Sequence, residues 1–214
     1  MRALVVADEV DERLWAGGAR GRPVDLVLGA GDLPFGYLAF LADALDRPCV
    51  FVPGNHDPDL SGFTRYGGLS MRGGFPEEWP GPPGGVDADG RVVDVAGLRI
   101  AGLGGSVRYN DGPNQWTQTQ QARRARKLVR AAERRRRKDG RGVDVLLTHA
   151  PPRGLGDRDD PPHHGFDCLH WTVERLRPKW LLHGHIHPYG EWPREHRIGE
   201  TRIRNVVGVH EVSL

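Results

Sequence analysis

Six polar side chains that could bind divalent metal ions are spread along the sequence, and each follows a short apolar run. They are Asp8, Asp32, Asn55, His149, His185 and His187. A mixed set of carboxylate, amide and imidazole donors suits a divalent ion such as Mn, Fe or Zn. Each residue alone is a weak signal, because Gly-Asp pairs usually form turns and a histidine after a strand is often structural. Their ordered recurrence along the chain predicts a metal centre.

The elements that must position these side chains alternate between strands and helices. Strands are expected at residues 2–7, 24–29, 48–53, 143–147 and 180–182, each ending beside one of the polar groups. Leu38, Leu41, Ala42 and Leu45 have the spacing of the buried face of a helix. The order strand, helix, strand predicts a largely parallel sheet. Because the C-terminal ends of parallel strands meet at one edge, we expect the six side chains to converge there.

The remaining segments are expected to complete a single domain over residues 1–214. Residues 58–90 are rich in Gly and Pro and predict a long irregular loop, whereas residues 91–103 predict a hairpin. Thr117 and Gln120 have the spacing of a capping box that opens a helix. A further helix is expected after Phe166, and both Trp171 and Trp180 are expected to pack in the core.

The composition, 38% hydrophobic and 27% charged, is typical of a globular protein. No apolar stretch approaches the roughly 20 residues that span a bilayer, and Met1 leads into a strand-like run rather than a signal peptide. The two cysteines, Cys49 and Cys168, lie in apolar patterns that predict buried free thiols in a reducing compartment. We therefore expect a cytoplasmic protein with no membrane partner.

The polar blocks together resemble the signature of the calcineurin-like metallophosphoesterases, in particular the small bacterial type. The blocks are Asp8, Gly31-Asp32, Gly54-Asn55-His56-Asp57, His149 and Gly184-His185-Ile186-His187. They cover nearly the whole chain, and the Gly-Asn-His-Asp and Gly-His-x-His blocks are the most specific. The resemblance implies an α/β fold, a four-layer α/β/β/α sandwich of two mixed β-sheets flanked by helices. It also implies a metal-dependent hydrolase of phosphate esters.

The same resemblance implies a ligand set for two divalent ions, with Mn, Fe or Zn as the expected metals. Asp32 would bridge the two ions. One ion would take Asn55, His149 and His185 as its further ligands, and the other would take Asp8 and His187. Such a pair of ions can clamp a phosphoryl group while hydroxide attacks in line.

Two residues of the third block would take part in catalysis. The resemblance implies that His56 contacts the phosphate and protonates the leaving oxygen, while Asp57 orients the imidazole and favours its charged form. An equally good interpretation of Asp57 is a turn cap before Pro58. His163 and His164 are expected to contact substrate phosphate or to lie in a solvent-exposed loop. Tyr37 is a further candidate for a substrate contact.

The first block departs from the family pattern. Relatives have Asp-x-His where this chain has Asp8-Glu9-Val10, and valine cannot coordinate a metal ion. We expect the ion assigned to Asp8 and His187 to bind more weakly, with water, Glu9, Asp11 or the hydroxyl of Tyr37 in place of the missing histidine.

Three functions remain open on the sequence. A small phosphate ester is the expected substrate, with phosphodiesters favoured over monoesters on the resemblance alone. A non-catalytic scaffold of the same fold is the first alternative; Val10 supports it and His56 opposes it. The second is a nuclease or nucleic-acid-binding protein using residues 123–138, which carry a net charge of +9 in a chain of +2. A solvated helix face is the commoner explanation of such a run, and no aromatic residue interleaves with it. The oligomeric state is not predicted.

Overall fold

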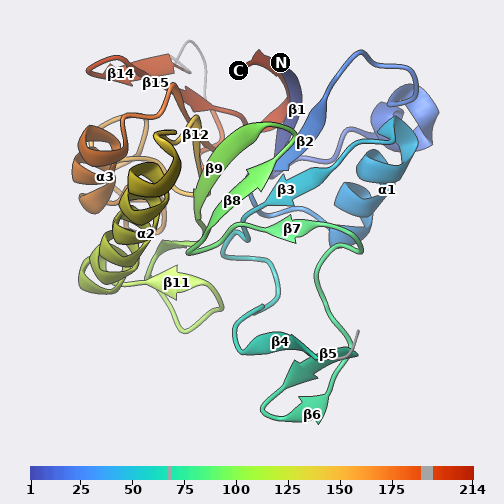
Figure 1. Cartoon of the computed structure of the whole chain (residues 1–214), viewed down its shortest axis with the longest axis horizontal. Helices are drawn as coiled ribbons and strands as arrows, with labels where there is room; N and C mark the ends of the chain where they lie inside the picture. The colour runs from blue at the N-terminus through green and yellow to red at the C-terminus, as the bar shows by residue number, and fades with distance from the viewer. Residues whose placement is uncertain (67–68, 189–194) are drawn as a thin grey trace.

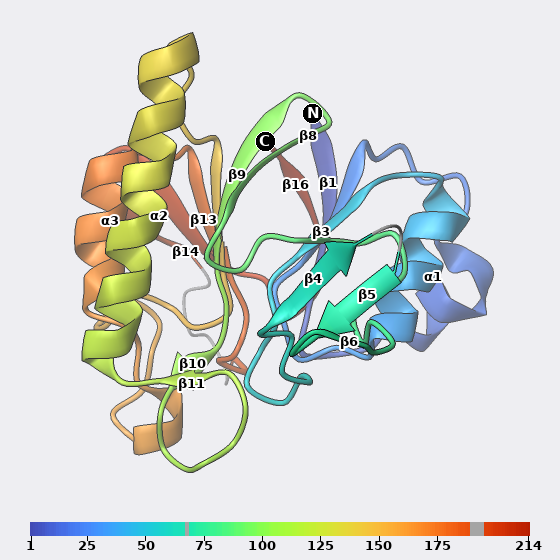
Figure 2. The ribbon, with the colours of Figure 1, turned by 60° about the horizontal axis from the view of Figure 1, so that its bottom comes forward.

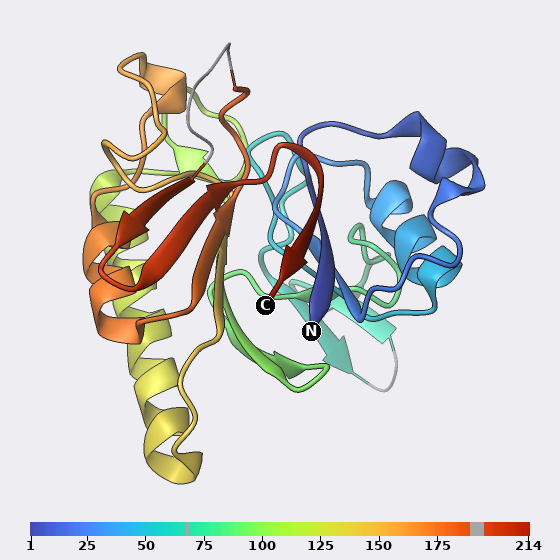
Figure 3. The same ribbon diagram turned by 90° about the horizontal axis from the view of Figure 1, so that it is seen from above.

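The computed structural model describes residues 1–66, 69–188 and 195–214. Two β-sheets pack face to face, with α1 on the outer side of one sheet and α2 and α3 on the outer side of the other (Figure 1). Seen from two further directions, the two halves keep this layered arrangement (Figures 2 and 3). The four-layer α/β/β/α sandwich expected from the resemblance is confirmed.

The first sheet has the strand order β16-β1-β2-β3-β7. Its strands are β1 (Arg2–Ala7), β2 (Leu26–Gly29), β3 (Cys49–Phe51), β7 (Val86–Asp87) and β16 (Gly208–Ser213). All neighbours run parallel except β16, which pairs antiparallel with β1. The helix α1 (Phe35–Leu45) connects β2 to β3, as the apolar spacing predicts.

The second sheet has the order β14-β15-β13-β12-β9-β8. Its strands are β8 (Val92–Val95), β9 (Leu98–Leu103), β12 (Val145–Thr148), β13 (Trp180–His183), β14 (Glu195–Ile198) and β15 (Thr201–Asn205). The four central strands are parallel, and β8 and β14 are antiparallel edges. The hairpin predicted over residues 91–103 is therefore confirmed, whereas β14 was not predicted.

Side chains alternate between two cores along the strands. In β1, Ala3, Val5 and Ala7 face the layer between the sheets, while Leu4 and Val6 face α1. A third core lies between the second sheet and the helices α2 (Gln118–Asp139) and α3 (Cys168–Leu176). The strands β2, β3, β12 and β13 are buried on both faces and therefore read as continuous apolar runs.

The capping box predicted at the start of α2 is present. The Thr117 hydroxyl accepts the Gln120 N–H, and the Gln120 side chain accepts the Thr117 N–H. The expected burial of the tryptophans is confirmed for Trp180, which is 2% exposed, and is wrong for Trp171, which is 39% exposed. Trp171 lies on α3, outside the arc of residues that packs against the sheet. Two short helical turns, η1 (Leu14–Gly18) and η2 (Pro161–His163), complete the helical elements described.

The irregular loop predicted over residues 58–90 is partly wrong. It contains a three-stranded antiparallel sheet of β4 (Phe63–Tyr66), β5 (Leu69–Arg72) and β6 (Phe75–Pro76), followed by β7. Gly73 and Gly74 both adopt positive φ and form the two-residue turn between β5 and β6. A Gly-Gly pair suits this turn because neither residue carries a Cβ that opposes positive φ. Two further short strands, β10 (Ser106–Val107) and β11 (Gln115–Trp116), pair with each other before α2.

None of the helices in the described part of the chain is long and apolar enough to cross a membrane. Of the two free cysteines, Cys49 is buried and Cys168 is partly buried. Burial raises the pKa of the Cys49 thiol to about 12, so this thiol stays protonated and behaves as an apolar group.

Candidate metal centre

The ends of β1, β2, β3, β12 and β13 bring the predicted ligands to one side of the sandwich. The two sheets meet here through Asp8, which follows β1, and His185, which follows β13. The Asp8 carboxylate accepts the His185 backbone N–H, with Oδ2 2.9 Å from the nitrogen. Residues separated by most of the chain are thus held next to each other.

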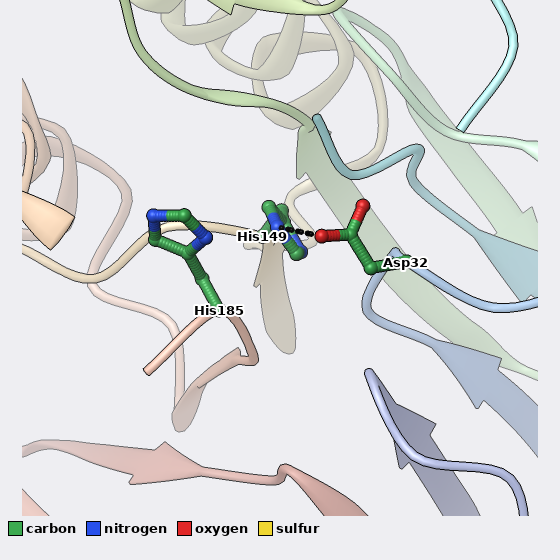
Figure 4. Close-up of side chains that lie close together, drawn as sticks. All are labelled: Asp32, His149 and His185. Carbon is green, nitrogen blue, oxygen red and sulfur yellow. Dashed lines mark ion pairs between the residues drawn. The ribbon is translucent and has the colours of Figure 1, made fainter. Parts of the chain in front are cut away.

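Three side chains place potential ligand atoms within 4.8 Å of one another: Asp32, His149 and His185 (Figure 4). His149 Nε2 lies 3.2 Å from Asp32 Oδ2 and 3.1 Å from Asn55 Oδ1. The cluster therefore contains carboxylate, amide and imidazole donors, the set that the sequence assigns to one ion. Such donors suit a borderline divalent ion such as Mn, Fe or Zn.

The charges in this cluster favour a cation beside Asp32. Burial disfavours the charged carboxylate of Asp32, but attraction to His149 outweighs it and lowers the pKa of Asp32 to about 2. Burial likewise disfavours the His149 imidazolium, but attraction to Asp32 outweighs it and raises the pKa of His149 to about 9. The surroundings thus favour positive charge beside Asp32, which is what a bound divalent ion supplies.

Backbone carbonyls fix both imidazole rings in orientations suited to ligation. His149 Nδ1 lies 2.7 Å from the carbonyl oxygen of Ala30, and His185 Nε2 lies 2.8 Å from that of Pro162. Each of these nitrogens can donate a proton to its carbonyl. His185 Nδ1 is then free to bind a metal ion, and at His149 Nε2 an ion would replace the proton that faces Asp32. Burial lowers the pKa of His185 to about 3, so its ring is neutral, as ligation requires. The residues present fit a metal ion.

Strained backbone at the ligands supports a functional role for this edge. Asp8, Asp32 and His185 have φ of 61°, 56° and 68°, a region that side chains other than Gly and Asn rarely adopt. Two glycines make room for the carboxylates: a Cβ at Gly54 would overlap the Asp32 carboxylate, and a Cβ at Gly184 would overlap that of Asp8. These close approaches explain why the Gly-Asn-His-Asp and Gly-His-x-His blocks each begin with a glycine.

The loop after β3 is braced by Asp57. Its Oδ2 accepts the N–H of Gly54 at 2.7 Å and that of Asp32 at 2.8 Å. Burial raises the pKa of Asp57 to about 6. Among the described residues no hydrogen bond joins Asp57 to the His56 ring. The contacts of the Asp57 carboxylate are therefore those of a turn cap. His56 donates its backbone N–H to Asp32 Oδ1 at 2.8 Å and exposes its side chain to solvent beside the cluster.

The ligands expected for the other ion are less well assembled. The Asp8 carboxylate is largely buried, and burial raises its pKa to about 6. His187 is half exposed, and its Nδ1 lies 3.0 Å from Glu9 Oε1. In the described part of the chain neither Asp8 nor His187 joins the cluster of Asp32, His149 and His185.

The structure distinguishes between the three side chains proposed to replace the missing histidine. Tyr37 is wrong both as a ligand and as a substrate contact, because its side chain is fully buried on α1 with its ring against Trp15. Asp11 hydrogen-bonds the Arg13 guanidinium through both carboxylate oxygens. Glu9, in contact with His187, is the one placed beside an expected ligand.

The segment 161–166 lies against the metal centre. The His163 ring centroid is 5.6 Å from that of His185, and His163 Nδ1 pairs with Asp160. His164 instead bonds the backbone oxygen of Asp159 through Nε2, at 2.9 Å. A contact of His163 or His164 with substrate stays a prediction.

Two residues that position the site have no signal in the sequence. The Tyr109 hydroxyl accepts from Asn55 Nδ2 at 3.2 Å, which turns Oδ1 of that amide toward His149. Asn114 donates its side-chain amide to the carbonyl oxygens of Gly54 and Asp57, both at 2.9 Å. Both residues lie in the irregular segment before α2, and only the folded chain brings them to the loop after β3.

Comparison with known proteins identifies the architecture. The sequence profile described as calcineurin-like phosphoesterase matches residues 7–189, which is most of the chain. The chain belongs to this family. The family is one of metal-dependent phosphoesterases.

Two relatives illustrate how far the similarity extends. The UPF0046 protein T07D4.2 of Caenorhabditis elegans is 48% identical over 48 residues, which are 22% of this chain and 12% of that protein. The crystal structure of TT1561 of Thermus thermophilus has a TM-score of 0.61 at 14% identity, covering 97% of this chain and 89% of the other. The second similarity concerns the fold alone.

Proposed function

We propose that the protein is a metal-dependent phosphoesterase that prefers phosphodiesters. The observation that carries this proposal is the cluster of Asp32, Asn55, His149 and His185, with the exposed His56 beside it. A buried donor set supplies the metal site, and a solvent-facing imidazole at its rim supplies a group that can reach a substrate. A scaffold would have no use for the second feature.

The residues have separate roles in this proposal. Asp32 and His149, with Asn55 and His185, hold an ion that, when bound, withdraws charge from phosphoryl oxygens and lowers the pKa of water. His56 donates a proton to the leaving oxygen. Asp57 keeps the loop in place through the N–H groups of Asp32 and Gly54 and thereby positions His56. A diester carries one negative charge and a monoester up to two, so a centre with a weak second ion favours diesters.

Reconstitution with metal tests the activity directly. Chelated protein is expected to be inactive and to hydrolyse bis-p-nitrophenyl phosphate after addition of Mn, Fe or Zn, with a smaller rate on p-nitrophenyl phosphate. Release of p-nitrophenol under identical conditions gives the ratio of diester to monoester activity. Folded protein that stays inactive with every metal would instead support the scaffold function, with Val10 as the suspected cause. A higher rate on the monoester would reverse the substrate preference.

The second ion, assigned to Asp8 and His187, is expected to bind weakly, and Glu9 beside His187 supplies a further carboxylate. Replacing Val10 by histidine restores the family's Asp-x-His block. This substitution should raise the number of tightly bound ions from one to two, because the site of Asp8 and His187 then gains an imidazole ligand. Val10→Gln is the matched control, because it adds polar bulk without an imidazole.

Calorimetric titration of Mn or Zn into chelated protein measures both affinities. Glu9→Gln should weaken the second site by at least about tenfold, a typical loss for a group that orients a ligand. Two equally tight sites in the unaltered protein would refute a weak second site.

A further inference from the structure

The outer side of α2 carries a row of six cations without ion-pair partners among the described residues. This basic face consists of Arg123, Arg126, Lys127, Arg130, Arg134 and Arg137, all of them exposed. At 3.6 residues per turn these positions fall within about 100° of the helix circumference and extend over roughly 21 Å. They lie opposite the buried residues of α2, such as Ala125 and Leu128.

Most acidic groups near α2 are paired with arginines outside the basic face, and the exception is Asp167, which lines a pocket together with Arg126. Asp89 pairs with Arg124, and Glu133 pairs with Arg175 on α3. Asp94 pairs with Arg99 and Arg135. The basic face therefore keeps a net positive charge, with Asp167 as a single acid at its N-terminal end. The C-terminal end of α2 extends beyond the sheets into solvent (Figures 2 and 3).

An exposed aromatic ring adjoins the basic face, although the linear sequence shows none there. Trp171, on the neighbouring helix α3, is 39% exposed. It lines a pocket of about 520 Å³ between the first turns of α2 and α3, and Arg126 lines the same pocket. Packing of the two helices thus places an indole next to Arg126, near the N-terminal end of the basic face.

We propose that the basic face and Trp171 bind single-stranded nucleic acid. Guanidinium groups bind phosphate oxygens through paired hydrogen bonds, and an exposed indole offers a surface on which a base can stack. A lipid surface fits less well, because the apolar side of α2 is already buried against the second sheet and has nothing to insert between acyl chains. The surface does not use the metal ligands, so the proposal does not depend on catalysis.

Fluorescence anisotropy with labelled 20-nucleotide polypyrimidine DNA and RNA, in the presence of chelator, tests the proposal. Contacts with about four phosphates predict that log K falls against log salt with a slope of about −2.8. The variant R126Q/R130Q/R134Q should bind at least about tenfold more weakly and reduce the slope by about 2. Trp171→Ala should weaken binding with the slope unchanged, because stacking releases no counterions.

A matched control changes the same charge elsewhere. R2Q/R13Q/R20Q removes three exposed arginines on the side of the first sheet and should bind like the unaltered protein. Glutamine retains helix propensity close to that of arginine, so the helix content measured by circular dichroism should match that of the unaltered protein. Equal weakening by the control variant would overturn the proposal, as would absence of binding at about 50 mM salt. Tighter binding to phosphatidylserine vesicles through the same three arginines would replace nucleic acid by a membrane surface. Unchanged binding by Trp171→Ala would overturn the stacking contact.

Discussion

Replacing Asp32 by asparagine is expected to lower phosphoester hydrolysis by at least about 10³-fold. Asp32 is the only carboxylate in the cluster described with His149 and His185, and its negative charge is what holds positive charge at this edge. A bound ion stabilises the transition state by several kcal/mol, and about 4 kcal/mol corresponds to 10³ in rate. The substitution is nearly isosteric, so the loss would reflect charge rather than packing.

The measurement combines turnover at saturating metal with the metal content of the purified protein. Asp43→Asn, an exposed position on α1, is the matched control and should retain both. We expect the Asp32 variant to lose metal and activity together. Full metal content with less than a tenfold loss of turnover would show that Asp32 is not a ligand.

Replacing His56 by alanine is expected to lower turnover of a diester with an alkoxide leaving group by about 10² to 10⁴-fold without changing the metal content. This is the usual range for loss of a general acid. The side chain is exposed at the rim of the cluster, and only its backbone N–H contacts Asp32. Removal of the imidazole therefore leaves that hydrogen bond in place. The metal site should be unaffected.

The leaving group supplies an internal control for this role. Nitrophenolate departs readily without a proton, whereas an alkoxide does not. The loss in His56→Ala should therefore be small for bis-p-nitrophenyl phosphate and large for dimethyl phosphate, whose only leaving group is methanol. Equal losses on both bonds would assign His56 to phosphate binding, and loss of metal would assign it to the ligand set.

Local patterns were enough to predict most of the elements. The apolar run of residues 2–7 predicts β1 with the bounds observed, because a fully buried parallel strand needs only a continuous apolar stretch. Thr117 and Gln120 predict the start of α2, because both hydrogen bonds of a capping box lie within one turn. The prediction was incomplete where strands are short and pair only with each other, as in β4, β5 and β6.

Exposure of single side chains could not be predicted in the same way. Tyr37 and Trp171 both lie on amphipathic helices near the boundary of the buried arc, and the sequence placed each on the wrong side. Tyr37 is covered by Trp15 of a segment before β2, and Trp171 is left uncovered between α2 and α3. Which of two such positions is buried depends on a neighbour from another part of the chain.

The sequence by itself determined which donors exist and that they follow strands, because both properties are local. Only the tertiary structure decided which of them meet. Packing of the two sheets brings Asn55, from the first, within 3.1 Å of His149, from the second, and leaves His187 with Glu9 at the exposed rim. Distances between side chains on different sheets are set by the layer of apolar residues between them, and no spacing along the chain encodes that separation.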